Sequence, residues 1–208
     1  MTLTGVEALA RLREGNGRFV SGVRSLEAML SHARRAELAT AQSPCAIVLG
    51  CSDSRAPAEI VFDQGLGDLF VIRVAGNIVA PSQVGSVEFA AERFHTPLVV
   101  VLGHTQCGAI GATLEAMSSR ASISPNLRDI VDRIRPSVEN LMGTGIEKDP
   151  DRFYHAAVRA NVRASADHLR HGSALLERLI LQDKLLVVGA EYSLETGAVD
   201  FFDGVPAD

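Results

Sequence analysis

Two short segments of the sequence carry side chains that could do chemistry together, Cys51-Ser-Asp-Ser-Arg55 and His104-Thr-Gln-Cys107. Two thiolates and one imidazole suit Zn²⁺, a borderline-soft ion that favours tetrahedral coordination. His104 and Cys107 are close enough in sequence to bind one ion. Three protein ligands leave a fourth position free, as in catalytic zinc sites. The sequence therefore predicts a catalytic zinc bound by Cys51, His104 and Cys107.

The elements that must position these residues follow from the apolar pattern. Four short apolar runs are typical of strands buried on both faces of a sheet, at 46–50, 69–74, 98–102 and 185–189. Helical patterns precede and separate them, at 4–20, 24–41, 83–94, 107–117, 125–141 and 151–182. This alternation predicts an α/β fold with a central, mostly parallel sheet of about four strands flanked by helices, with an N-terminal helical arm. The run 197–202 is expected to add an antiparallel edge strand.

Two of the predicted strands end alike. Residues 46–50 and 99–103 both finish with Leu-Gly, and Cys51 and His104 come next. Ligands of open α/β sheets bind beyond the carboxyl ends of the strands. Cys51 and His104 are therefore expected at the same sheet edge.

The composition excludes several classes of protein. A chain of 208 residues with 47% hydrophobic residues can bury one sizeable core and is not mainly disordered. A net charge of −5 argues against nucleic acid or an anionic membrane as a partner. Three cysteines are too few for a disulfide framework, and Cys45, at a strand start, is predicted to pack in the core. No secretory signal or membrane-length apolar run is present, so we expect a cytoplasmic location.

Five segments together resemble the β-class carbonic anhydrases: 51–57, 67–77, 85–90, 103–108 and 188–197. The resemblance implies a zinc lyase that hydrates CO₂ reversibly to bicarbonate and a proton, by attack of a zinc-bound hydroxide. It assigns Cys51, His104 and Cys107 to the zinc, with Asp53 and Arg55 as a catalytic dyad. It also implies a homodimer in which N-terminal helices wrap the partner, often paired into a homotetramer. The whole chain, 1–208, is then one domain, with a helical dimerisation arm at 1–41 and a zinc-binding core at 42–208.

The same resemblance suggests residues that contact the substrate. An apolar wall, partly across the dimer interface, is expected from Phe70, Ala75 and Phe89, with Gln64 as an amide donor and Gly108 beside the substrate. Some family members have an allosteric bicarbonate pocket that uses a tryptophan shortly before the first zinc cysteine. This chain has Val48 there and no tryptophan, which argues against that regulation.

Asp53 has two possible roles. Its carboxylate could accept a hydrogen bond from the zinc-bound hydroxide, or it could itself become the fourth ligand in a closed site. Arg55 can hold it in a bidentate pair, and the sequence leaves the open and closed arrangements as alternatives. Two thiolates cancel the charge of Zn²⁺, so the bound water should be less acidic than at an all-histidine site and activity should rise toward alkaline pH.

The sequence also allows other functions, which differ from a CO₂-hydrating zinc lyase in the residues that they need. Hydrolysis of CS₂ or COS would use the same ligands, and a structural zinc module would have no task for Asp53 and Arg55. A thiol oxidoreductase would need C-x-x-C where this chain has H-x-x-C. We expect His168 and His171 to lie on a solvated helix face and Gly65-Leu-Gly67 to form a loop. Arg73 and Asn77 could equally support the adjoining strand or contact the site.

Overall fold

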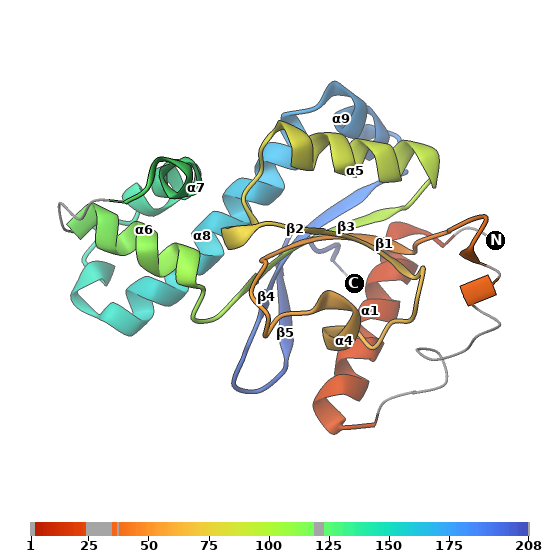
Figure 1. Cartoon of the computed structure of the whole chain (residues 1–208), viewed down its shortest axis with the longest axis horizontal. Helices are drawn as coiled ribbons and strands as arrows, with labels where there is room; N and C mark the ends of the chain where they lie inside the picture. The colour runs from red at the N-terminus through yellow and green to blue at the C-terminus, as the bar shows by residue number, and fades with distance from the viewer. Residues whose placement is uncertain (1–2, 24–34, 37, 119–122, 208) are drawn as a thin grey trace.

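The computed structural model describes residues 3–23, 35–36, 38–118 and 123–207 (Figure 1). At its centre is a five-stranded sheet in the order β2-β1-β3-β4-β5. The strands are β1 (Ala46–Gly50), β2 (Leu69–Arg73), β3 (Leu98–His104), β4 (Leu186–Tyr192) and β5 (Val199–Asp203). The first four are parallel, and β5 runs antiparallel to β4 at the edge. The predicted fold class and edge strand are confirmed.

Helices cover both faces of this sheet. On one face lie α1 (Gly5–Ser21) and the short α4 (Ala58–Val61); on the other lie α5 (Pro81–Arg93), α8 (Pro150–His171) and α9 (Ala174–Leu181) (Figure 1). Alternate residues of one strand serve the two faces: Val48 packs with α1 and α4, whereas Ile47 and Leu49 pack with α5 and α8. This two-sided burial explains the continuous apolar runs in the sequence.

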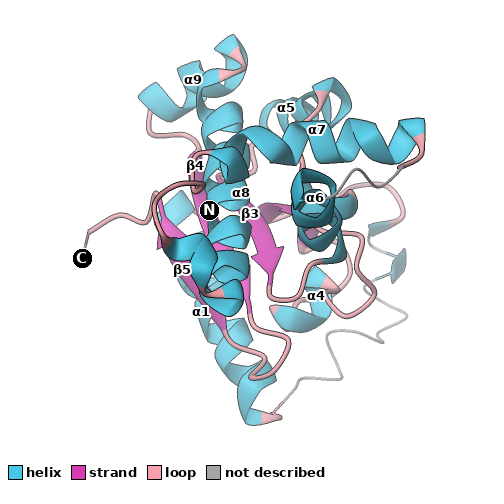
Figure 2. Ribbon diagram, turned by 90° about the vertical axis from the view of Figure 1, so that its left-hand side faces the viewer, coloured by secondary structure: helices cyan, strands magenta, loops and turns pink. Residues whose placement is uncertain are grey.

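A third cluster lies beyond the carboxyl ends of the strands. It contains α6 (Gly108–Ser118) and α7 (Pro125–Glu139), which pack against the amino-terminal half of α8 (Figure 2). Two short 3₁₀ segments, η1 (Ala75–Asn77) and η2 (Ile146–Lys148), adjoin these helices. Cys51 and Cys107 belong to the same cluster, so the candidate metal site lies between the sheet edge and this helical layer.

Helix α8 packs close to the sheet at two glycines. A β-carbon at Gly103 of β3 would lie 2.5 Å from Val162 Cγ2, and one at Gly189 of β4 would lie 2.8 Å from Val162 Cγ1. Only glycine at these two positions leaves room for Val162. The approach of α8 to the strand that ends in His104 is therefore set by two missing side chains.

The structure differs from the sequence prediction in three places. The helical pattern at 151–182 is two helices, because the Ser173 hydroxyl caps a new helix by accepting a hydrogen bond from Leu176 N. Helix α4 was not predicted. His104 is the last residue of β3 rather than the residue after the strand.

The amino-terminal prediction is confirmed in part. Helix α1 forms as expected, begun by a capping box between Thr4 and Glu7, and it buries Leu9 and Leu12 against the sheet of its own chain. Most of the second predicted helix, at 24–41, lies outside the described residues. In the described part of the chain, no helix is both long and apolar enough to span a membrane.

Candidate metal centre

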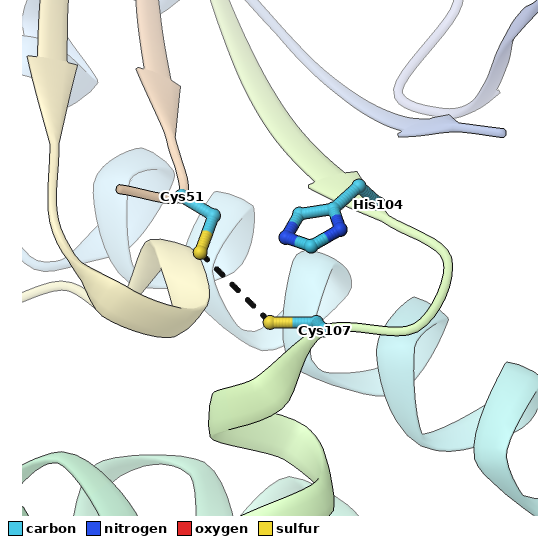
Figure 3. A group of neighbouring side chains, drawn as sticks. All are labelled: Cys51, His104 and Cys107. Atoms are coloured by element: carbon cyan, nitrogen blue, oxygen red, sulfur yellow. Dashed lines mark hydrogen bonds between the residues drawn. The ribbon is translucent and has the colours of Figure 1, made fainter. Parts of the chain in front are cut away.

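The three predicted ligands converge at one point. Cys51 follows β1, His104 ends β3, and Cys107 immediately precedes α6 (Figure 3). Because β1 and β3 are parallel neighbours, their carboxyl ends lie together. The candidate ligand atoms all lie within 4.8 Å of one another, and the two sulfurs are 3.9 Å apart. The structure thus brings together side chains that are up to 56 positions apart in sequence.

The donor set fits a metal ion. All three side chains are buried, with relative exposures of 6% for Cys51 and 1% each for His104 and Cys107. His104 Nδ1 lies 2.8 Å from the carbonyl oxygen of Thr105, which fixes that nitrogen as the N–H donor. The other nitrogen, Nε2, is buried and has no hydrogen-bond partner among the described residues. A buried imidazole nitrogen without a partner, facing two thiols, is suited to Zn²⁺.

The environment of Cys51 favours its thiolate. Hydrogen bonding from the Cys107 thiol lowers the pKa of Cys51, and contacts with His104 and the Gly76 N–H act in the same direction against burial. The Gly76 nitrogen lies 3.3 Å from the Cys51 sulfur. The S–H that Cys107 donates to Cys51 raises the pKa of Cys107. Burial raises it further, and so does the charge of Cys51, since two neighbouring buried thiolates repel each other. A divalent cation between the sulfurs would remove that repulsion.

Asp53 lies at the margin of this group and is held by Arg55. Arg55 Nε is 2.9 Å from Asp53 Oδ1, and Arg55 Nη2 is 2.7 Å from Asp53 Oδ2. These bonds from Arg55 hold the pKa of Asp53 well below its usual range, so the carboxylate is ionised. Asp53 Oδ2 is 3.9 Å from His104 Nε2. The carboxylate is therefore close to the candidate metal position while both of its oxygens are bound by Arg55.

Backbone contacts tie the two ligand segments together. Arg55 Nη2 also donates to the carbonyl oxygen of Gln106, at 3.2 Å, in the loop between His104 and Cys107. Arg73 donates from Nε to the carbonyl oxygen of Cys51, at 2.9 Å, and from Nη2 to that of Asp53. Of its two proposed roles, Arg73 therefore supports the backbone that carries Cys51 and Asp53.

Three residues that support the site were not identified from the sequence. Tyr154 of α8 donates its hydroxyl hydrogen to the carbonyl oxygen of Cys107. Asn161 and Ser165, also on α8, donate to the carbonyl oxygens of Gly76 and Asn77. One sequence signal could have found the last two: both are polar residues four positions apart within the buried stripe of an amphipathic helix.

The predicted substrate-contact residues are dispersed. Ala75 precedes Gly76 and so lies beside Cys51, and Gly108 opens α6 with free space where a β-carbon would be. Phe70 and Phe89 pack with each other, with ring centres 6.2 Å apart, in a cluster that includes Phe94. The amide of Gln64 is buried and donates to the carbonyl oxygens of Phe62 and Asp63. The contacts of the described residues do not bring Phe70, Phe89 or Gln64 to the metal group.

The assignments of Cys45, the two α8 histidines and the glycine-rich loop agree with the structure. Cys45 is buried in the apolar core beside α1. His168 and His171 are exposed on α8, and Gly65 to Gly67 form a loop between α4 and β2. Among the described residues, Cys51, His104 and Cys107 are the one group of three with the geometry to bind a metal.

Comparison with known proteins supports the family resemblance seen in the sequence. The family model described as carbonic anhydrase matches residues 46–199. Carbonic anhydrase 2 of Mycobacterium tuberculosis is 42% identical over 92% of this chain and 90% of its own length. The solved β-carbonic anhydrase CafA of Aspergillus fumigatus is similar in fold, with a TM-score of 0.74 at 24% identity, over 96% of this chain and 91% of that one. A tetrameric β-carbonic anhydrase of Sordaria macrospora has a TM-score of 0.72 at 24% identity, over 81% and 85% of the two chains. The chain belongs to the β-class carbonic anhydrase family.

Proposed function

We propose that this chain catalyses the reversible hydration of CO₂ to bicarbonate and a proton at a Zn²⁺ site formed by Cys51, His104 and Cys107. The observation that carries the proposal is the buried His104 Nε2, which has no hydrogen-bond partner among the described residues and faces two thiols within 4.8 Å. Bound there, zinc would supply a Lewis acid that makes water nucleophilic near neutral pH.

Asp53 and Arg55 distinguish this site from a structural zinc module. The ionised Asp53 carboxylate can only accept hydrogen bonds, so it can orient the O–H of the attacking nucleophile and leave a lone pair directed at the carbon of CO₂. Arg55 binds both carboxylate oxygens. This contact keeps Asp53 as a hydrogen-bond acceptor and prevents it from becoming a metal ligand. We therefore propose the open arrangement, in which the fourth position is left for the reacting oxygen.

We further propose that the chain acts as a homodimer or homotetramer. Phe89 is 54% exposed on α5, next to β2, which is an edge strand of the sheet. An exposed aromatic side chain beside an open sheet edge favours burial by a second copy. In such an assembly the aromatic pair Phe70 and Phe89 would form the apolar wall for CO₂, and Gln64 remains our candidate amide donor. Sedimentation of the purified protein tests this, since a monomer at all concentrations would contradict it.

The three free cysteines support a reducing location, and we propose the cytoplasm. Fractionation of cells that express the tagged full-length protein tests this location.

Stopped-flow CO₂ hydration with parallel metal analysis tests the proposed function. We expect about one zinc per chain, lost in Cys51→Ser and Cys107→Ser but retained in the control Cys45→Ser, which alters a core thiol. Asp53→Ala should keep zinc and lose most of the rate. A zinc-loaded wild type that is inactive from about pH 7 to 9, where such sites operate, would overturn the proposal.

The pH dependence tests the charge of the ligand set separately. Because two thiolates offset the charge of Zn²⁺, we expect the hydration rate to rise from about pH 6.5 to 9. A flat profile over this range would contradict the assignment of two thiolate ligands.

A further inference from the structure

The backbone beside Cys51 adopts a conformation that needs support. Gly76 has φ 70° and Asn77 has φ 43°, so two successive residues of η1 are left-handed. This turn is what directs the Gly76 N–H at the Cys51 sulfur, 3.3 Å away. A non-glycine residue in the left-handed region costs free energy, less for asparagine than for most, so contacts that favour this conformation of Asn77 stabilise the turn.

Helix α8 supplies those contacts. Asn161 Nδ2 donates to the carbonyl oxygen of Gly76 at 2.7 Å, and Ser165 Oγ donates to that of Asn77 at 3.0 Å. The two side chains are one helical turn apart and lie on the same face of α8. Both are buried, with relative exposures of 2% and 5%. Two consecutive carbonyl oxygens of the turn therefore each accept a hydrogen bond from the same face of α8.

The position of α8 is itself fixed. Val162, next to Asn161, packs into the space left by Gly103 and Gly189. Gly103 directly precedes His104 on β3. The same helix thus packs against the strand that carries one candidate ligand and donates to the turn that contacts another.

We propose that Asn161 and Ser165 are positioning residues for the zinc site. By fixing the Gly76–Asn77 turn, they keep the Gly76 N–H aimed at the Cys51 sulfur, which orients that sulfur and removes part of its charge when it binds the metal. Hydrogen-bond partners outside the ligand set commonly change metal affinity about 10- to 100-fold. This inference rests on the zinc site of the proposed function and extends it to a helix that provides no ligand.

Zinc affinity in matched variants tests the inference. Asn161→Ala removes the donor to Gly76, and Ser165→Ala is a milder change on the same face. Asn16→Ala is the control, because Asn16 is also a buried amide that joins distant backbone, donating to the carbonyl oxygens of Val61 and Gly197. Competition with a chromophoric chelator gives the zinc dissociation constant. We expect Asn161→Ala to weaken zinc binding about 10-fold or more, Ser165→Ala to weaken it less, and Asn16→Ala to leave it unchanged.

Two readouts separate positioning from a general loss of stability. The thiolate-to-metal charge-transfer band of the Co²⁺-substituted protein should shift in Asn161→Ala and not in Asn16→Ala, even if both variants melt earlier. In zinc-free protein, the Gly76 amide hydrogen should exchange faster in Asn161→Ala. If folded Asn161→Ala and Ser165→Ala both bind zinc with wild-type affinity and show an unshifted band, the positioning role is wrong, and the proposed function is unaffected. A wild type that binds no zinc would overturn the proposed function as well.

Discussion

Arg55 binds both oxygens of the Asp53 carboxylate, at 2.9 and 2.7 Å, while the same carboxylate lies 3.9 Å from the unpartnered nitrogen of His104. Asp53 is thus one side-chain movement away from the candidate metal position, and Arg55 opposes that movement. The guanidinium is suited to this because its planar fork matches a carboxylate at two points.

Arg55→Lys should release Asp53. A lysine ammonium keeps the charge but cannot bind both oxygens in the same plane, so the carboxylate gains access to the metal position. We expect kcat/KM for CO₂ hydration to fall about 10- to 100-fold with zinc retained. Arg133→Lys is the control, because Arg133 forms an ion pair with Asp129 on the surface of α7. Equal rates in Arg55→Lys and wild type would show that the fork is not needed.

Asp53 should also make stability depend on acidity. Its pKa is lowered in the folded chain by Arg55, so the carboxylate contributes stability that is fully present above the unfolded value of about 4. That contribution is lost as the pH falls toward the lower folded pKa. In chelator-treated protein, the difference in unfolding free energy between wild type and Asp53→Ala should therefore shrink on going from neutral pH to below about pH 4. Urea unfolding at several pH values measures it, and a constant difference would refute the prediction.

Gly76→Ala should destabilise the chain. The position has φ 70°, and a β-carbon there would lie 2.8 Å from Ile134 Cδ1 and 3.0 Å from Ala109 Cβ. Backbone strain alone costs about 1–3 kcal/mol, and the crowding adds to it. Gly17→Ala, in the interior of α1 with no atom within 4 Å of the new carbon, should instead stabilise the chain, by about 0.5–1 kcal/mol. Denaturant unfolding measures the change in unfolding free energy of each variant. The prediction is wrong if both changes have the same sign.

Tyr154→Phe should loosen the loop that carries Cys107. The change removes the hydroxyl that donates to the Cys107 carbonyl oxygen, which keeps its helical bond from Gly111 N. We expect a loss of about 1 kcal/mol of unfolding free energy. Tyr192→Phe is the matched control, since within the described part of the chain only burial acts on the Tyr192 hydroxyl, with no hydrogen bond to it. A larger loss in the control than in Tyr154→Phe would contradict the assignment.

Local pattern accounts for the part of the site that could be predicted. Cys51 and His104 each follow a Leu-Gly pair at the end of a buried apolar run, and the parallel pairing of those runs brings the two side chains to one edge. Chemical type then suffices to suggest the metal, because few ions favour two thiolates and an imidazole.

The supports of the site could not be predicted in the same way. Asn161 and Gly76 are 85 positions apart, and the donor–acceptor pairing between them depends on how closely α8 approaches the sheet. That approach depends in turn on Gly103 and Gly189, two small residues in different strands. Helix periodicity shows which face of α8 is buried, but it does not identify the backbone atoms that this face meets.

The strand order β2-β1-β3-β4-β5 has a consequence for the timing of folding. The three candidate ligands lie between Cys51 and Cys107, and β1, β2 and β3 can pair as soon as the first half of the chain exists. Strand β4 covers the other side of β3, and it arrives together with α8 from the second half. During synthesis from the ribosome, a chain that has emerged only as far as α6 holds every ligand without the helix that braces them. Closing the connection from β3 to β4, which contains α8, is slow and costs conformational entropy. Tight metal binding should therefore come late in synthesis of the chain.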